Sequence, residues 1–548
     1  MTLLYPEYLK PHINILKPVE RFFNNLINSM DRYYGELLSR AMKHKKTVVF
    51  GGIFGTLLIE LIFLIFIGKE SMPTVDEGQF EVSLTFPVGT RVEITDRLTK
   101  EAENIIINNL KNNLKSVFVR IEKSGSSFFR QFSEYSSRIR VRLKEKENRE
   151  ISQDKAIELV RKSLKNFPAR VRISGSGSAN MLFGMSGKPV SIEIRGEDLD
   201  IAKKIGNKIV DEITRIEGIR EPDISLEEQL PELKISINRN ISSKLGLNAY
   251  NIAQNISIAF GGSYVAKYRG DKGTELDILL RLREVDRINI DNILNLTIPT
   301  PVGKLVPLAS IVNIEKSFSP TTINRKDNSR YITVSSDIYG RPLDKVIEDV
   351  KQTIKSKIFI PTGFNINYSG SYQQMIESFQ QLILALILAV ILIYAIMASQ
   401  FESLIAPFVI MFAVPFGFAG SLFLLLITGK TLNIVSLIGI IVLAGIVVNN
   451  GIVLLDYMNQ LLHQGMEVDK AAIEAGMRRL RPVSMTTLTT ILGLIPMALG
   501  LGQGSELYSS MAISIIGGLT ISTIFTLIIV PTAYAAIRKR FPIKKYED

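Results

Sequence analysis

Apolar residues along the chain are gathered into six long blocks that are separated by polar stretches. A membrane-crossing helix needs about 20 predominantly apolar residues, and every block is close to that length. The blocks are Thr47–Ile67, Phe379–Met397, Leu404–Thr428, Leu432–Tyr457, Pro482–Leu501 and Met511–Ile537. The pattern therefore predicts an α-helical integral membrane protein with six transmembrane helices, the first standing alone and the other five close together.

Basic residues at the ends of the blocks predict how the chain is oriented. Lys and Arg collect before the first block, between the fourth and fifth, and after the sixth, whereas the opposite short loops have few. Cytoplasmic loops carry such an excess. We therefore expect residues 1–46 and a basic tail at 538–548 in the cytoplasm, a five-helix bundle at 379–537, and residues 68–378 in the periplasm.

The segment before the first block has the periodicity of an amphipathic helix. Its apolar residues on one face are Phe22, Phe23, Leu26, Ile27, Met30, Tyr33, Tyr34, Leu37, Leu38 and Ala41. With its basic end, such a helix is typical of an interfacial helix on the cytoplasmic leaflet. A helix packed against another part of the protein would show the same pattern, and both interpretations stay open.

The polar stretch between the first and second blocks alternates short strands with helices. From Phe80 to Ser174 the predicted order is β-α-β-β-α-β, the split βαβ pattern of ferredoxin-like folds. A similar series begins at Val190, is interrupted near Pro231 and resumes at Arg330. We expect two α+β sandwich subdomains, the second with an insertion at about 231–328.

Composition narrows the chemistry that this chain can carry out. It has 548 residues, no cysteine, three histidines and a net charge of +12. Thiolate metal sites and disulfides are excluded, and the charge is explained by Lys and Arg at the membrane flanks rather than by nucleic acid. No nucleophile motif, Walker loop or dinucleotide fingerprint is present. We therefore expect neither an enzyme nor a cofactor nor a bound metal.

One loop, Gly175–Gly187, is rich in Gly and Ser and contains Met181 and Met185. Thioether sulfurs are soft ligands suited to copper(I). Two methionines in a loop more often serve packing, so the loop is not predicted to be a metal site.

Strongly polar side chains inside the apolar blocks are the candidate functional residues, because they are costly in a bilayer. Asn449 and Asn450 lie in the middle of the fourth block, and Asp456 follows two turns nearer the cytoplasm. Glu60 lies inside the first block. Hydrogen bonding between helices is the plainer explanation for the two amides, and contact with a wet groove or a partner helix is one for Glu60.

Two more candidates, Arg479 and Thr486, flank the start of the fifth block. An arginine here also serves as a topological anchor. The threonine hydroxyl can donate and accept hydrogen bonds, although bonding to its own helix backbone is the simpler expectation.

Several motifs, in this order along the chain, resemble one transporter family. They are the FF…Y…L helix, MPTVDEGQFEVSLTFPVGT, GSYQQMIES, ASQFESLIAPFVIMFAVPFGFAG, GIVVNNGIVLLDY and EAGMRRLRPVSMTTLTTILGLIPMALG. From about residue 20 to 540, the chain resembles the C-terminal half of a resistance-nodulation-division (RND) efflux transporter of the hydrophobe/amphiphile class.

This resemblance implies a proton-driven antiporter of the inner membrane that exports amphiphilic small molecules. Complete members have twelve spans and work as trimers with a periplasmic adaptor and an outer-membrane channel. The sandwich subdomains would then be porter subdomains, and the insertion would be part of a docking domain. Because the chain resembles only one half, we expect an N-terminal-half chain or a full-length RND partner to complete it. Export of lipids or metal ions, or an inactive scaffold fragment, are the alternatives.

The resemblance also implies roles for individual residues in the membrane. Asn449, Asn450, Arg479 and Thr486 match positions of the family's proton relay, whose paired aspartates belong to the N-terminal half. Well-studied drug pumps have lysine where Asn449 stands, which leaves the charge balance of the relay open.

In the periplasmic part, the loop Ser124–Tyr135 stands where the family has a loop between two drug pockets. Phe128, Phe129 and Phe132 are therefore candidate substrate contacts, with packing inside a hairpin as the alternative.

Overall fold

The computed structural model describes residues 17–73, 75–87, 90–121, 135–175, 188–225, 230–270, 273–287, 290–319, 323–501 and 504–539. The chain forms two compact units, one made of Met1–Ser225 with Asn324–Asp548 and the other of Leu226–Ile323. The smaller unit falls within a few residues of the predicted insertion.

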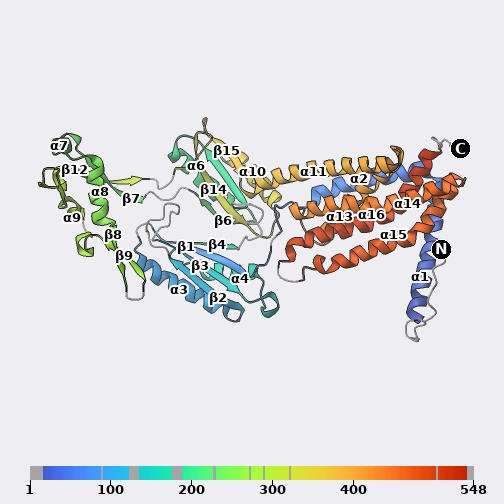
Figure 1. Ribbon diagram of the computed structural model, residues 1–548, viewed down its shortest axis with the longest axis horizontal. Helices are drawn as coiled ribbons and strands as arrows, with labels where there is room; N and C mark the ends of the chain where they lie inside the picture. The colour runs from blue at the N-terminus through green and yellow to red at the C-terminus, as the bar shows by residue number, and fades with distance from the viewer. Residues whose placement is uncertain are drawn as a thin grey trace. The chain divides into compact units, whose positions relative to one another are not determined.

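Five of the described helices, counting α12 with α13 as one, are long and apolar enough to cross a membrane. They are α2 (Lys45–Phe66), α11 (Ser371–Gln400), α12 (Ile405–Ile410) with α13 (Ala413–Ile427), α14 (Ile434–His463) and α16 (Glu506–Arg538). The predicted span Pro482–Leu501 lies mostly in α15 (Val468–Ala498), which is not among the five because its apolar run is diluted by threonines. Helix α15 nevertheless runs beside α14 and α16 (Figure 1).

Helices α13 and α16 pack with their backbones in close contact because both have glycines at the crossing. A Cβ added to Gly420 would lie 2.4 Å from the carbonyl oxygen of Gly517, and the reverse distance is also 2.4 Å. The Ser421 hydroxyl donates a hydrogen bond to the carbonyl oxygen of Ser514 at 2.7 Å. Small residues and interhelical hydrogen bonds are the usual means of helix association in lipid.

Helix α1 (Lys17–Lys43) packs part of its apolar face against the bundle. Tyr34 and Leu38 are buried in the core formed with α14, α15 and α16. The Tyr34 hydroxyl donates a hydrogen bond to the carbonyl oxygen of Leu527, in α16, at 2.7 Å. For these residues the structure supports packing on the protein, the second of the two interpretations of the amphipathic pattern, while Tyr33 is 70% exposed.

Two antiparallel sheets share one topology. The first has the order β2-β3-β1-β4 and the second contains β6-β14-β5-β15, so each follows the order 2-3-1-4 of a split βαβ unit. The first subdomain consists of β1 (Gln79–Thr85), α3 (Val92–Leu110), β2 (Leu114–Ile121), β3 (Ser136–Leu143), α4 (Gln153–Ser163) and β4 (Arg170–Gly175). The second consists of β5 (Val190–Arg195), α6 (Leu199–Ile213), β6 (Ile219–Ile224), β14 (Ser329–Ile338), α10 (Leu343–Lys357) and β15 (Asn365–Ser369), with β13 (Arg325–Lys326) paired to β14.

The predicted pair of sandwich subdomains is therefore present, and each sheet buries alternate residues against its helices. In β1 the alternation places Phe80, Val82 and Leu84 in the core. Strand β6 was not predicted, because Glu221, Pro222 and Asp223 interrupt its apolar pattern. It is the second strand of its subdomain and pairs with β14.

The smaller unit is an independent α+β body with a core of its own. Its elements are β7 (Leu230–Ile237), α7 (Arg239–Lys244), α8 (Ala249–Phe260), β8 (Ser263–Arg269), β9 (Glu275–Leu280), α9 (Ile290–Leu294), β10 (Thr297–Pro299), β11 (Leu305–Pro307) and β12 (Val312–Ser319). Ile252, Ile298 and Leu308 are fully buried in it.

Candidate functional site

Three packed helices meet at Asn450, which faces α15 and α16 from the middle of α14. Its Nδ2 donates hydrogen bonds to the Oγ1 atoms of Thr487 at 3.3 Å and Thr523 at 3.4 Å. The two threonine hydroxyls are 3.1 Å apart, and both residues are buried. We call these three residues the Asn450 cluster; it is neutral, because amides and hydroxyls supply both its donors and its acceptors.

The neighbouring Asn449 faces away from this cluster. It belongs to a row of exposed residues on α14 with helical spacing, which we call the open stripe: Ile438, Val442, Gly445 and Asn449. A Cβ added to Gly445 would meet no atom within 4 Å. Asp456, two turns further on, is also exposed, and its carboxylate accepts a hydrogen bond from Gln460 of the same helix at 2.9 Å.

Arg479 of α15 lies against the ring of Tyr457 of α14. The guanidinium carbon is 4.8 Å from the ring centre, within the range of a cation–π interaction. The Nε of Arg479 is buried and has no hydrogen-bond partner among the described residues. Buried donors normally have partners, so this side chain keeps hydrogen-bonding capacity that the described part of the chain does not use.

Thr486 does not join the Asn450 cluster. It is exposed, and its hydroxyl donates to the carbonyl oxygen of Val483 in its own helix at 2.9 Å. The next residue, Thr487, makes the interhelical contact because one step along a helix rotates a side chain by about 100°. Sequence reasoning missed Thr487 and Thr523; the signal for Thr523 was a series of hydroxyl residues at helical spacing in the last span.

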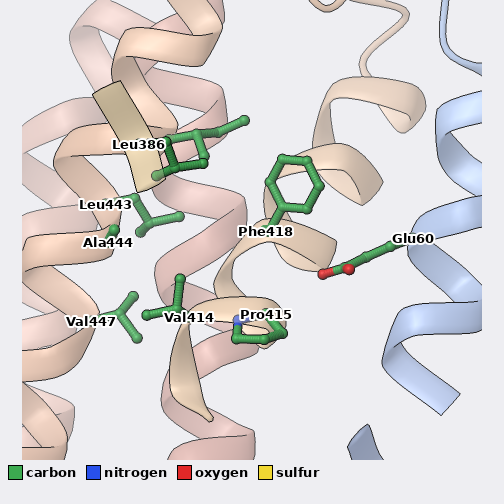
Figure 2. A pocket seen from close by; sticks show the side chains of 9 residues that line it. Glu60, Leu386, Val414, Pro415, Phe418, Leu443, Ala444 and Val447 are labelled. Atoms are coloured by element: carbon green, nitrogen blue, oxygen red, sulfur yellow. The ribbon is translucent and has the colours of Figure 1, made fainter. Parts of the chain in front are cut away.

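Glu60 is buried in α2, with 8% of its surface exposed, and its Oε1 has no hydrogen-bond partner among the described residues. The carboxylate points toward Pro415 and Phe418 of α13 (Figure 2). It lines a cavity of about 210 Å³ whose other walls are apolar side chains of α11, α13 and α14. Of the two surroundings considered for Glu60, a wet groove or a partner helix, the described structure shows a neighbouring helix, α13, beside a largely apolar cavity.

In the segment between α2 and β1, Asp76 joins the first sandwich subdomain to the start of α16. Its carboxylate accepts hydrogen bonds from Arg149 at 2.5 Å and from the backbone N–H of Gln153 at 3.1 Å. Its own backbone N–H donates to Glu506 at 2.9 Å, which also pairs with Lys146. Burial works to raise the pKa of Asp76, but the hydrogen bonds from Arg149 and Gln153 outweigh it and hold that pKa below its ordinary value.

Some predicted residues fall outside the part of the chain that the structure describes. These are the substrate-contact candidates Phe128, Phe129 and Phe132, and the loop methionines Met181 and Met185. Within the described ranges, no group of three or more His, Asp or Glu side chains is placed to hold a metal ion.

The sequence of the chain matches the AcrB/AcrD/AcrF family over residues 4–538. The chain belongs to this family. It is thus part of an RND transporter rather than an enzyme, and a multi-pass membrane protein. The predicted fold class, a helical membrane part with an α+β region of small antiparallel sheets, is confirmed.

The chain is similar to several named proteins. It is 26% identical over 527 residues to the nickel and cobalt resistance protein CnrA of Cupriavidus metallidurans, which covers 92% of this chain and 48% of CnrA. It is 25% identical over 536 residues to the protein HelA of Legionella pneumophila, covering 94% of this chain and 50% of HelA. The crystal structure of a heavy metal efflux pump aligns with a TM-score of 0.78 at 24% identity, covering 94% of this chain and 52% of that one. The chain thus spans about half the length of these relatives.

Proposed function

We propose that the chain is the C-terminal half of an RND exporter of divalent transition-metal ions. The observation that carries the proposal is similarity along nearly the whole chain to a protein named for nickel and cobalt resistance, together with 26% identity over 357 residues to the cobalt-zinc-cadmium resistance protein CzcA of Cupriavidus metallidurans. These relatives favour metal ions over the amphiphilic compounds expected from the motifs. We therefore assign the chain to the RND family as a whole and not to the hydrophobe/amphiphile class that its motifs resemble.

Export of amphiphilic compounds is the second candidate. The swarming motility protein SwrC of Bacillus subtilis is 28% identical over 341 residues, 61% of this chain and 32% of SwrC, and its name mentions no metal. A test of cargo must therefore include an amphiphile.

In this proposal, proton coupling takes place where the open stripe of α14 contacts the N-terminal half of the transporter. Asn449 is exposed there and Arg479 has an unused donor. Carboxylates of an N-terminal-half chain would accept hydrogen bonds from both when ionised. Protonation would remove that charge and release the contacts, which allows helices to shift. Asn450 would hold α14 in register with α15 and α16 while this happens, and Thr486 would lie on the exposed side of α15.

The complete transporter is proposed to sit in the inner membrane with both termini in the cytoplasm. The two sandwich subdomains and the smaller unit would face the periplasm. A trimer joined to a periplasmic adaptor and an outer-membrane channel would carry the cargo across the envelope.

The test is coexpression with an N-terminal-half chain in an efflux-deficient strain, followed by measurement of retained cobalt, nickel, zinc and cadmium and of a fluorescent cationic dye. We expect retained metal to fall several-fold when both halves are present and to rise again on collapse of the proton gradient. Arg479→Ala should abolish export. Arg478→Ala is the matched control, because Arg478 is exposed and pairs with Glu474 of its own helix at 3.0 Å.

Two results would contradict the proposal. If the dye falls while every metal stays, the cargo is amphiphilic. If neither falls although both halves are inserted and associated, the chain is a scaffold rather than a pump.

A further inference from the structure

The cavity beside Glu60 combines one buried carboxylate with apolar walls. Among the described residues that line it, Glu60 is the only charged one, and the lining includes Leu386 of α11, Phe418 of α13, and Leu443 and Val447 of α14 (Figure 2). All of these helices belong to the larger unit. It is separate from the Asn450 cluster, whose residues do not line it.

A carboxylate in such surroundings stays ionised only when a positively charged group pairs with it. Removing it from water is costly unless it is paired and hydrogen-bonded, and ionisable residues inside membrane spans are functional candidates for that reason. Among the described residues, no ion pair involves Glu60, and its Oε1 is buried without a hydrogen-bond partner. The missing partner can therefore come from a ligand.

The chemistry of the walls decides which cation fits. A divalent metal ion takes several oxygen, nitrogen or sulfur ligands, whereas here a single carboxylate faces hydrocarbon. A primary ammonium group has three donors and can be attached to an apolar body. The ring of Phe418, on the same side of the cavity as the carboxylate (Figure 2), adds a cation–π surface.

The size of the cavity sets the size of the ligand. A volume of about 210 Å³ is larger than the engineered 150 Å³ apolar cavity that binds benzene. It therefore has room for a benzene ring that carries a few further atoms, roughly the size of a benzylamine.

We propose that this cavity is a binding site for a small lipophilic primary amine, with its ammonium group paired to Glu60 and its hydrocarbon part among the apolar side chains of α11, α13 and α14. This proposal does not depend on the metal-export proposal.

The test measures binding of 4-fluorobenzylamine to the purified full chain in lipid nanodiscs by fluorine NMR, with empty nanodiscs subtracted. We expect the dissociation constant to rise about tenfold or more for Glu60→Gln, which removes the charge. The same rise is expected for Ala444→Leu, which fills the cavity that Ala444 lines. Gly445→Leu is the matched control and should bind as the wild type does, since an added Cβ there meets no atom within 4 Å. Circular dichroism of each variant verifies folding.

A neutral probe of the same shape, 4-fluorobenzyl alcohol, distinguishes charge recognition from simple partitioning. We expect it to bind the wild-type chain about tenfold more weakly than the amine. The proposal would be overturned if both probes bound the wild type equally and still bound Glu60→Gln. That result would mean that the cavity recognises only the apolar part of a ligand. Failure of the amine to bind the wild type would overturn the proposal as well. Metal export is not measured, so failure here leaves the proposed function untouched.

Discussion

Two adjacent threonines of α15 show how the direction of a side chain decides whether its hydrogen bond joins two helices. The Thr487 hydroxyl is buried and reaches both Asn450 and Thr523, whereas the Thr486 hydroxyl is satisfied by its own helix. A polar group in a bilayer contributes to packing only when a neighbouring helix offers a partner. Substitutions of these two residues therefore compare the contribution of an interhelical hydrogen bond to stability with that of an intrahelical one.

We expect Thr487→Val to lower the free energy of unfolding by about 0.6–1.7 kcal/mol, the range for interhelical hydrogen bonds in membranes. Valine keeps the shape of the side chain and removes the hydroxyl. Thr486→Val should change it by less than about 0.5 kcal/mol, as exposed substitutions usually do. Thermal unfolding of both purified variants measures the difference, and equal effects would show that the cluster adds no stability.

At the scale of elements, the helices of the bundle approach one another closely only where side chains are small. The crossing of α13 and α16 brings Gly420 and Gly517 together, and α16 is also the helix most covered by its neighbours, with 67% of its apolar window buried. The connection after α2 is held differently, by Asp76 and its charged partners. Close packing of small residues thus holds α13 against α16, whereas charged side chains hold the segment after α2 in place.

The helix crossing predicts that Gly420→Ala destabilises the bundle by about 1–3 kcal/mol through overpacking. The added methyl group would lie 2.4 Å from a backbone oxygen that cannot move aside alone. Gly445→Ala, on the open stripe of α14, is the control and should be neutral or slightly stabilising. Thermal unfolding compares the two; a neutral Gly420→Ala would show that the crossing is wider than described.

The junction at Asp76 predicts a pH dependence. Because the folded-state pKa of Asp76 lies below its ordinary value, the carboxylate stabilises the fold above the unfolded pKa of about 3.9. That contribution is lost as pH falls through the lower, folded-state pKa. Asp76→Asn should therefore cost about 2 kcal/mol at neutral pH, and the difference from wild type should shrink below about pH 4.

Thermal unfolding of the wild type and Asp76→Asn across this pH range measures the effect. Asp96→Asn is the control, because Asp96 forms an exposed pair with Lys100 in its own helix and such pairs contribute little. A difference that stays constant with pH would rule out the carboxylate as its source.

At the scale of the whole molecule, the chain leaves much apolar helix surface uncovered. Only 6% of the apolar window of α11 and 11% of that of α2 are buried, against 50% for α14. Lipid can cover the first two helices. On α14, however, the open stripe contains a strongly polar residue, Asn449, and polar residues in spans face protein or water rather than lipid. We propose that the N-terminal half of the transporter covers this stripe.

A labelling experiment tests this inference. The chain contains no cysteine, so Gly445→Cys introduces a single reactive thiol in the open stripe. A membrane-permeant maleimide should label it in the chain alone, and coexpression with an N-terminal-half chain should slow labelling about tenfold by burying the thiol. Gln464→Cys, exposed in the connection between α14 and α15, should be labelled equally in both cases. Unchanged labelling of Gly445→Cys would place the other half elsewhere.

Local patterns in the chain were enough to find the helices that enter the membrane and both sandwich subdomains. Apolar run length and the alternation of strands such as β1 are properties of neighbouring residues, so they can be read without a fold. Elements that break the pattern were missed or weakened. Strand β6 carries Glu221, Pro222 and Asp223, and the apolar part of α15 is diluted by threonines.

The partners of individual side chains required the tertiary structure. The sequence marked Asn450 as unusual and named Thr486 as a candidate, but it gave no sign of Thr487, because the partner of Asn450 depends on how α15 is rotated against α14 and α16. In the same way, the surroundings of Glu60 depend on four helices that are up to about 390 positions apart in the chain. Helix rotation and long-range packing leave no periodic trace in the sequence, so the cavity and the Asn450 cluster appear only when the helices are assembled.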